Sequence, residues 1–117
     1  MKKVIYSFLL LLLFTYTGCE LLQDLFATDV EYTVTGTTTL VDITIENEDG
    51  GTSQFSDVSV PWSYEFQGNS GDFVYVSAQN QLDTGSVTVK IYTDGSVFKT
   101  STSVGAYVIA TASGLLP

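Results

Sequence analysis

From Asp29 to the end of the chain, β-branched and aromatic residues alternate with polar ones. Clusters of glycine, asparagine, aspartate and serine interrupt this alternation about every 8–12 residues, which is the spacing of turns in all-β domains. Successive side chains of a β-strand point to opposite faces, so an alternating strand buries one face and exposes the other. The pattern therefore predicts an all-β fold, either a sandwich or a barrel.

The predicted strands occupy seven stretches of the chain, one of them a hairpin: 29–38, 40–47, 54–60, 62–68, 73–80, the hairpin 86–100, and 106–112. Stretch 54–60 has the weakest pattern, so we expect either a weak strand or a sheet edge there. Stretch 73–80 is apolar on both faces at its start, which indicates a central strand. Asp49-Gly50 and Asp94-Gly95 suit the positive φ angles of tight hairpin turns. The tail "SGLLP" has no clear assignment.

The aromatic residues of stretch 62–68 fall on one face. Trp62, Tyr64 and Phe66 alternate with polar residues after Pro61, and a tryptophan in this position is more often core than a stacking platform for a sugar or a lipid. Ala110 and Ala112 share a face of the last strand. Their small size indicates close packing against a bulky side chain such as Trp62.

The first eighteen residues have the layout of a secretory signal. Lys2 and Lys3 precede the apolar run "VIYSFLLLLLF", and small or polar residues follow it. An apolar stretch of about 7–15 residues after a basic start is typical of a signal peptide, whereas a spanning helix needs roughly 20 apolar residues. We therefore predict a signal peptide over residues 1–18 rather than a retained membrane span.

Cys19, the only cysteine, directly follows Gly18. This arrangement resembles the lipobox of bacterial lipoproteins, in which the thiol receives a diacylglyceryl group and becomes the first residue of the mature chain. Tyr16 stands where the lipobox usually has leucine. We predict that Cys19 is lipidated, with acyl chains such as palmitate, because two or more acyl chains hold a protein on a membrane durably. A free cysteine behind an ordinary signal peptide is the alternative.

Cleavage before Cys19 would leave a tether over residues 19–28 and a single β-sandwich domain over residues 29–117. Residues 19–117 have two lysines against thirteen acids, a formal charge of −11. Such a domain is repelled by nucleic acid and by anionic headgroups. We expect a location at the cell envelope, on the periplasmic or surface side of a bacterial membrane, with no nucleic-acid partner.

The sequence offers little material for catalysis. It has no histidine, which excludes Ser-His-Asp, Cys-His and histidine-metal sites. The stretch "SVFK" (96–99) matches Ser-x-x-Lys, but it lies in a predicted strand, where residues three apart point to opposite faces. Glu46, Glu48 and Asp49 could bind calcium through carboxylate oxygens, but their spacing is not that of a calcium loop, and a solvated acidic hairpin fits better. We expect no catalytic residue, no metal, no cofactor and no enzymatic activity.

Five segments together resemble the periplasmic domain of the mycobacterial membrane protein small (MmpS) family. They are "EYTVTGT" (31–37), "VSVPWSYEF" (58–66), "VSAQN" (76–80), "GSVTVKIYTDG" (85–95) and "SVGAYVIATASG" (103–114). The resemblance implies an immunoglobulin-like β-sandwich of seven or eight antiparallel strands. It also implies an accessory role beside resistance-nodulation-division exporters, which carry lipids or siderophores in that family. Members usually have a transmembrane helix, and many have a cysteine pair where this chain has Val89 and Ala112.

Two functions are therefore consistent with the sequence. The first is a lipid-anchored interaction module of the cell envelope, with the membrane bound through Cys19 and an integral envelope protein such as a transporter as its partner. The second is a lipoprotein that binds a small ligand, either a lipid, a glycan or calcium. The acidic loops and the numerous aromatic residues favour the second function, while the anchor and the resemblance favour the first.

Overall fold

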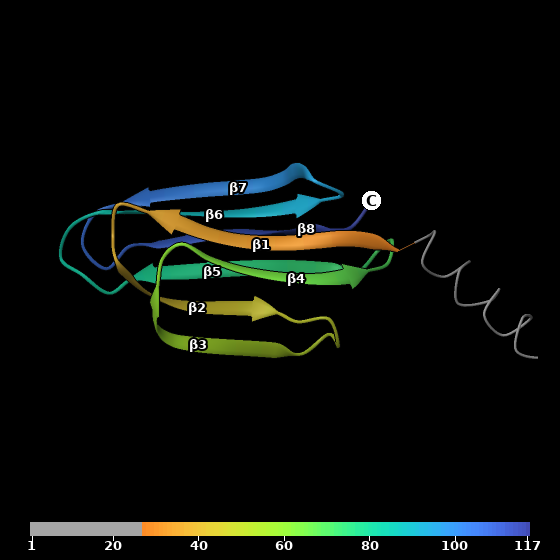
Figure 1. Cartoon of the computed structure of the whole chain (residues 1–117), viewed down its shortest axis with the longest axis horizontal. Coiled ribbons are helices and arrows are strands. Elements are labelled where there is room, and N and C mark those ends of the chain that lie inside the picture. The colour runs from red at the N-terminus through yellow and green to blue at the C-terminus, as the bar shows by residue number, and fades with distance from the viewer. Residues whose placement is uncertain (1–26) are drawn as a thin grey trace, which may run out of the picture.

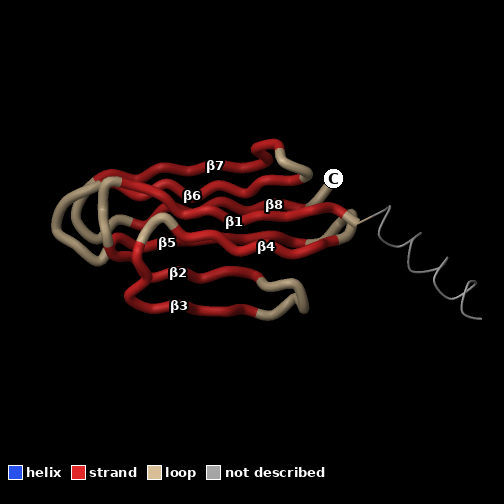
Figure 2. Tube along the Cα trace, in the orientation of Figure 1, coloured by secondary structure: helices blue, strands red, loops and turns tan. Residues whose placement is uncertain are grey.

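The computed structural model describes residues 27–117, which form two four-stranded antiparallel sheets packed face to face (Figures 1 and 2). Sheet A has the strand order β4-β1-β6-β7 and sheet B the order β3-β2-β5-β8. The strands are β1 (Thr28–Gly36), β2 (Leu40–Glu46), β3 (Thr52–Ser59), β4 (Trp62–Gly68), β5 (Phe73–Asn80), β6 (Ser86–Thr93), β7 (Ser96–Val104) and β8 (Ile109–Leu115). The all-β sandwich with eight antiparallel strands is thus confirmed.

Within residues 27–117, only β2–β3 and β6–β7 are hairpins within a sheet, and every other connection crosses between the sheets. The two-sheet architecture is that of an immunoglobulin-like sandwich, although the strand order is not the ABED and CFG order of an antibody constant domain. The predicted edge strand is β3, and the predicted central strand is β5, which lies between β2 and β8. Both predictions are confirmed. Among residues 27–117 there is no helix long and apolar enough to cross a bilayer.

The crossing connections give the sandwich two distinct ends, which we call the base and the tip. The base contains the start of β1 and the loops 47–51, 69–72 and 94–95. The tip contains the loops 37–39, 60–61, 81–85 and 105–108. Figure 1 shows the start of β1 and the C-terminus at the base, with the tip at the opposite end. A strand of nine residues at about 3.3 Å per residue separates the two ends by roughly 30 Å.

The core is built from the inward side chains of the five strands β1, β2, β5, β6 and β8. Its fully buried aliphatic members are mostly valines, isoleucines and alanines: Val30, Val34, Val41, Ile43, Ile45, Val74, Val76, Ala78, Val87, Val89, Ile91 and Ala110. The tail that had no sequence assignment also contributes, because β8 continues to Leu115 and Leu116 is buried. Leu116 donates its backbone N–H to the backbone carbonyl oxygen of Asp72 at 2.8 Å, which closes the base.

The two lateral sides of the sandwich differ. The backbones of β7 and β8 run close together, whereas those of β3 and β4 stand apart. Gly114 of β8 makes the close approach possible, since a Cβ there would lie 3.0 Å from the Phe98 ring. Phe98 is therefore the bulky side chain beside Gly114 of β8, and the prediction that the last strand packs against Trp62 was wrong. Trp62 lies on β4, at the other side.

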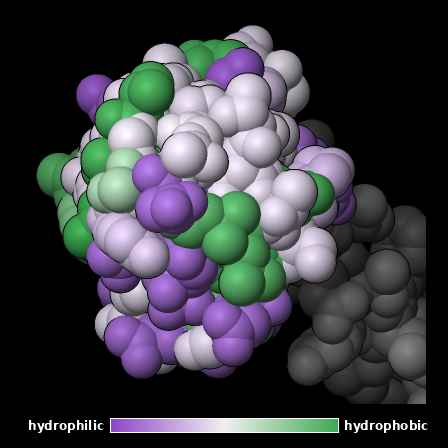
Figure 3. Space-filling model, turned by 90° about the vertical axis from the view of Figure 1, so that its left-hand side faces the viewer, coloured by the Kyte–Doolittle hydropathy of each residue, from purple (hydrophilic) through white to green (hydrophobic). Residues whose placement is uncertain are grey.

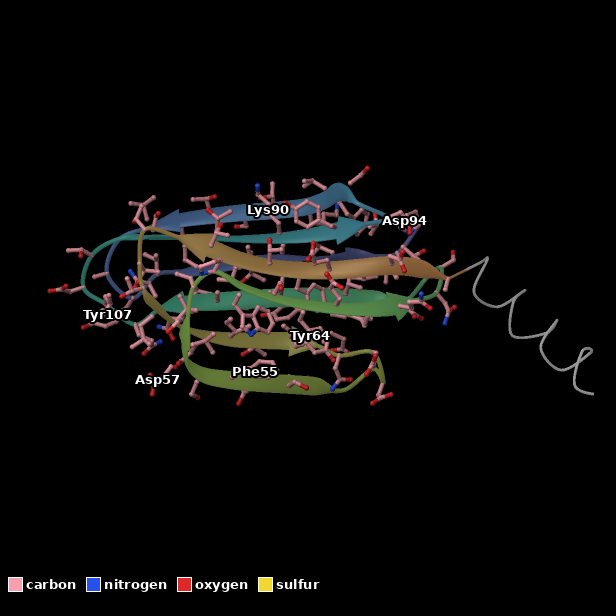
Figure 4. The ribbon with its side chains drawn as sticks, in the orientation of Figure 1. Phe55, Asp57, Tyr64, Lys90, Asp94 and Tyr107 are labelled. Atoms are coloured by element: carbon pink, nitrogen blue, oxygen red, sulfur yellow. The ribbon has the colours of Figure 1, made fainter. Side chains whose placement is uncertain are left out.

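Aromatic side chains fill the space between β3 and β4. Trp62 and Tyr64 stack at 6.2 Å between ring centroids, Phe55 of β3 lies 5.4 Å from Trp62, and Phe66 lies 5.8 Å from Tyr64. All four are half-buried against the core, and Figure 4 shows Phe55 and Tyr64 on this side of the molecule. Trp62 packs at the margin of the core rather than at its centre. In this sense the prediction that Trp62 belongs to the core is confirmed.

Tyr32 is the buried polar link between the two sheets at the base. Its side chain has no exposed surface. From β1 in sheet A, its hydroxyl donates to the carbonyl oxygen of Glu46 at 2.8 Å and accepts the backbone N–H of Tyr75 at 3.2 Å, both in sheet B. Burial raises the pKa of Tyr32 to about 12, with the nearby Glu46 carboxylate adding to the effect of burial.

Removing this hydroxyl by Tyr32→Phe should lower the free energy of unfolding by about 1–3 kcal/mol, because a buried carbonyl and a buried N–H lose their partner. Tyr64→Phe is the matched control, since Tyr64 stacks on Tyr32 but takes no part in these two hydrogen bonds. Urea denaturation at pH 7 measures both variants. Equal losses in the two variants would contradict the role of Tyr32 as the link.

The raised pKa of Tyr32 also makes the stability of the wild type depend on alkaline pH. An unfolded tyrosine ionises near pH 10, whereas folded Tyr32 keeps its proton to about 12. The folded state therefore holds the extra proton between these values, and stability should fall as pH rises from 10 to 12. The same denaturation series should show a smaller loss over this interval in Tyr32→Phe than in the wild type.

Candidate interaction surface

Cys19, the predicted lipidation site, lies outside the described residues, and so do the predicted signal peptide and most of the tether. The chain that follows them enters the sandwich at Thr28, at the base. The nine residues 19–27 span at most about 30 Å when extended. A membrane anchor at Cys19 would consequently keep the base near the membrane.

The base is strongly acidic. Its hairpin loop contains Glu48 and Asp49 next to Glu46, and the loop 69–72 brings Asp72 to the same region. These carboxylates and Phe73 line a shallow depression of about 330 Å³. In residues 27–117 no three histidine, cysteine or acidic side chains gather closely enough to hold a metal ion. The predicted hairpin is present, with Gly50 at a φ of 79°.

A second acidic feature is a carboxyl pair on the outer face of sheet A. Glu31 of β1 lies directly opposite Glu65 of β4, and both line a depression of about 450 Å³ together with Phe66 and Tyr92. Desolvation raises the pKa of Glu31, and the hydrogen bond and charge repulsion from Glu65 raise it further. The pair is a like-charge contact on an open sheet face, which costs stability when both groups are ionised.

The Ser-x-x-Lys match of the sequence is a surface feature of β7. Ser96 begins the strand, and the register shifts by a β-bulge between Ile91 and Tyr92 of the neighbouring β6. Lys99 lies over the Phe98 ring, 5.1 Å from its centroid. Lys99 thus covers apolar surface beside Gly114, as the long stem of a lysine commonly does.

The tip is organised by one buried amide. Asn80, at the end of β5, has no exposed surface. Its Nδ2 donates to the carbonyl oxygens of Thr84 at 2.9 Å and Gly105 at 3.0 Å, and its Oδ1 accepts Thr38 Oγ1 at 2.7 Å and the N–H of Leu82 at 3.0 Å. Asn80 therefore joins three loops of the tip: 37–39, 81–85 and 105–108.

Apolar side chains are exposed around the loops that Asn80 joins. Val104, Tyr107 and Ile109 are 75 %, 56 % and 54 % exposed, and Leu82 is 36 % exposed. We call these four residues the tip patch. Sequence reasoning missed the patch, because its members come from two loops and two strand ends that only the fold brings to one end. The available signal was Asn80 itself, a polar residue at a core-facing position of an alternating strand.

The sandwich lies almost wholly within a match to a known protein family. The family model described as Mycobacterium membrane protein matches residues 20–113, most of the chain. The matched region includes Tyr32, the carboxyl pair, Asn80 and the whole tip patch. No curated protein matches the chain.

Replacing Asn80 by aspartate tests whether its hydrogen bonds hold the three loops of the tip together. Asn80→Asp keeps the shape but cannot donate to the carbonyl oxygens of Thr84 and Gly105. We expect a loss of about 2 kcal/mol or more in the free energy of unfolding at pH 7. Asn69→Asp, which adds the same charge at an exposed loop position among the carboxylates of the base, is the control and should lose clearly less. Urea denaturation measures both, and an equal effect in both would contradict the role of Asn80.

Relieving the carboxyl pair should stabilise the domain. A carboxyl whose folded pKa is raised favours folding below its unfolded pKa and loses that contribution as pH rises through the folded value. Glu65→Gln should therefore be more stable than the wild type at pH 7, by on the order of 0.5 kcal/mol, and equal to it near pH 3. Thermal melts at both pH values measure this. Asp83→Asn, away from the pair, provides the comparison for a general loss of negative charge.

Proposed function

The chain belongs to the family described as Mycobacterium membrane protein, and on that premise we propose that it is a lipid-anchored interaction module of the cell envelope. The family description is that of a membrane protein, which is consistent with a location at the envelope. The lipid anchor at Cys19 is the finer part of the proposal. It is supported by the basic start, the short apolar run and the glycine-cysteine pair.

The observation that carries the proposal is the geometry of attachment. The chain reaches the sandwich at the base, and Cys19 lies close enough in sequence to hold that end at a membrane surface. The acidic base is repelled by anionic headgroups, so the anchored domain stands away from such a membrane with its tip outward. A domain presented in this way is suited to contact another envelope protein.

The partner that we propose is an integral envelope protein, with an exporter as the specific form that the family resemblance implies. An interaction role needs no catalytic group. The carboxyl pair Glu31–Glu65 lies on an open sheet face rather than in an enclosed site. The alternative of small-ligand binding has less support, because the space between β3 and β4 is already filled by aromatic side chains. They are those of Phe55, Trp62, Tyr64 and Phe66.

Metabolic labelling with an alkynyl fatty acid tests the anchor. The wild-type chain should incorporate the label and remain with the membranes after a carbonate wash, whereas Cys19→Ala should lose both properties. Adding Thr100→Cys to the Cys19→Ala chain restores a thiol at an exposed position of β7 and should not restore labelling. An unlabelled wild type, or a labelled Cys19→Ala variant, would contradict lipidation at this residue.

A further inference from the structure

The tip patch is an apolar surface at the end of the molecule that faces away from the chain's entry. Figure 3 looks onto this end and shows apolar side chains gathered beside hydrophilic ones, and Figure 4 places Tyr107 there. The largest member, Tyr107, offers a ring with little conformational freedom, which is the type of side chain that anchors protein interfaces. More than half of its surface is exposed.

The patch is held in a fixed shape. Tyr107 has a φ of 56°, a left-handed conformation that an aromatic residue adopts only under restraint from its surroundings. Its N–H donates to the carbonyl oxygen of Leu82 at 3.1 Å, and its own carbonyl oxygen accepts Gln79 Nε2 at 3.1 Å. The backbone N–H of Asn80 donates to the carbonyl oxygen of Val108 at 2.9 Å. Because the loops are already ordered, binding would cost less conformational entropy than at flexible loops.

The charges near the tip have one sign. Asp83 lies in the loop 81–85, and Asp42 and Asp57 lie at the tip-side parts of β2 and β3, where Asp42 Oδ1 accepts the N–H of Asp57 at 2.9 Å. The two lysines among residues 27–117, Lys90 and Lys99, lie within β6 and β7 instead, and Figure 4 shows Lys90 away from the tip. The tip therefore combines an apolar centre with carboxylates at its margin.

This charge distribution decides among the partners that an apolar patch could accept. A second copy of the chain would bring the same carboxylates to the contact, and like charges facing each other oppose association. An anionic lipid surface is opposed for the same reason. A protein with lysine or arginine around an apolar area complements both the centre and the margin of the patch.

We propose that the tip patch is the docking surface for a protein partner that presents an apolar area bordered by lysine and arginine side chains. The proposal deepens the proposed function and rests on it, since it assigns the interaction to one end of the sandwich. Leu82, Tyr107 and Ile109 form the apolar contact. Asp42, Asp57 and Asp83 provide the complementary charge.

Site-specific photocrosslinking of the full chain in the membranes of its own cells tests this surface. A photoreactive residue replaces Tyr107 in one chain, Thr100 on the outer face of sheet A in a second, and Ser113 on the outer face of sheet B in a third. All three positions are exposed. After irradiation, mass spectrometry identifies the crosslinked peptide rather than only the captured protein.

We expect the Tyr107 position to give an adduct with one protein, at a yield at least fivefold above the two sheet-face positions. The crosslinked peptide should contain apolar residues flanked by lysine or arginine. The yield should fall several-fold in about 0.5 M NaCl, where the screening length is roughly 4 Å. An adduct with a second copy of the chain, an adduct with lipid, or a yield that does not respond to salt would overturn the proposed partner.

The same experiment separates this inference from the function on which it rests. Protein adducts from Thr100 or Ser113 without one from Tyr107 would overturn the tip as the docking surface and leave the interaction module standing. The absence of protein adducts from all three positions would overturn both.

A matched pair of double variants provides an independent readout, with the photoreactive residue at Val104. Leu82→Ser with Ile109→Ser makes the tip polar, and Phe73→Ser with Leu115→Ser makes the same kind of change to the exposed apolar pair at the base. The tip variant should lower the adduct yield about tenfold, and the base variant should leave it unchanged. Equal yields from the two variants would overturn the proposal. Thermal melts establish that both variants are folded.

Discussion

The sandwich depends on Tyr32, which among residues 27–117 is the one fully buried side chain that forms hydrogen bonds from sheet A to the backbone of sheet B. Valine, isoleucine and alanine fill most of the core, and their contacts have no direction that would fix how one sheet sits on the other. The Tyr32 hydroxyl supplies that direction at the base, where it binds the end of β2 and the start of β5 together. Its ring also packs against Tyr64 and Phe66 and so connects the centre of the core to the aromatic side chains between β3 and β4. The same residue thus joins the two sheets through its hydroxyl and contacts the aromatic side chains through its ring.

Asn80 has the corresponding role at the tip, but with a different consequence. Tyr32 links strand to strand, whereas Asn80 links loop to loop and uses all of its amide's hydrogen-bonding capacity on the chain itself. A satisfied buried amide rigidifies its surroundings, while an unsatisfied one is costly. The loops of the tip are therefore ordered without any contribution from outside the domain. This order allows Val104, Tyr107 and Ile109 to stay exposed as a defined surface rather than collapse onto the core.

The alternation of apolar and polar residues was sufficient to predict the strands, but it was insufficient to predict the surface features. Alternation located the eight strands, but the last one begins at Ile109 and not at Ala106, because residues 106–108 form a loop of the tip. Asp94-Gly95 identified the β6–β7 turn, where both residues have positive φ angles. The alternation did not predict the structure of the tail, because Gly114 interrupts the pattern just before Leu116 enters the core. The pairing of Glu31 with Glu65 and the assembly of the tip patch join residues far apart in sequence. Such pairings follow from the order of strands in the sheets, which alternation does not encode.

The distribution of charge makes the base and the tip of the sandwich different, although its two sheets are similar. Carboxylates gather at the base, in the loops beside the chain's entry, while the opposite end has an ordered apolar surface with fewer acids. A domain tethered at an acidic end is pushed away from an anionic surface, and its freedom to lie flat on that surface is reduced. The other end then becomes the part that most readily meets a neighbouring protein. A lipid anchor at Cys19, as proposed, would produce this orientation because the chain enters at the base and the tip patch lies at the opposite end of strands about 30 Å long. The crossing connections, which create these two ends, would then matter for function as well as for stability.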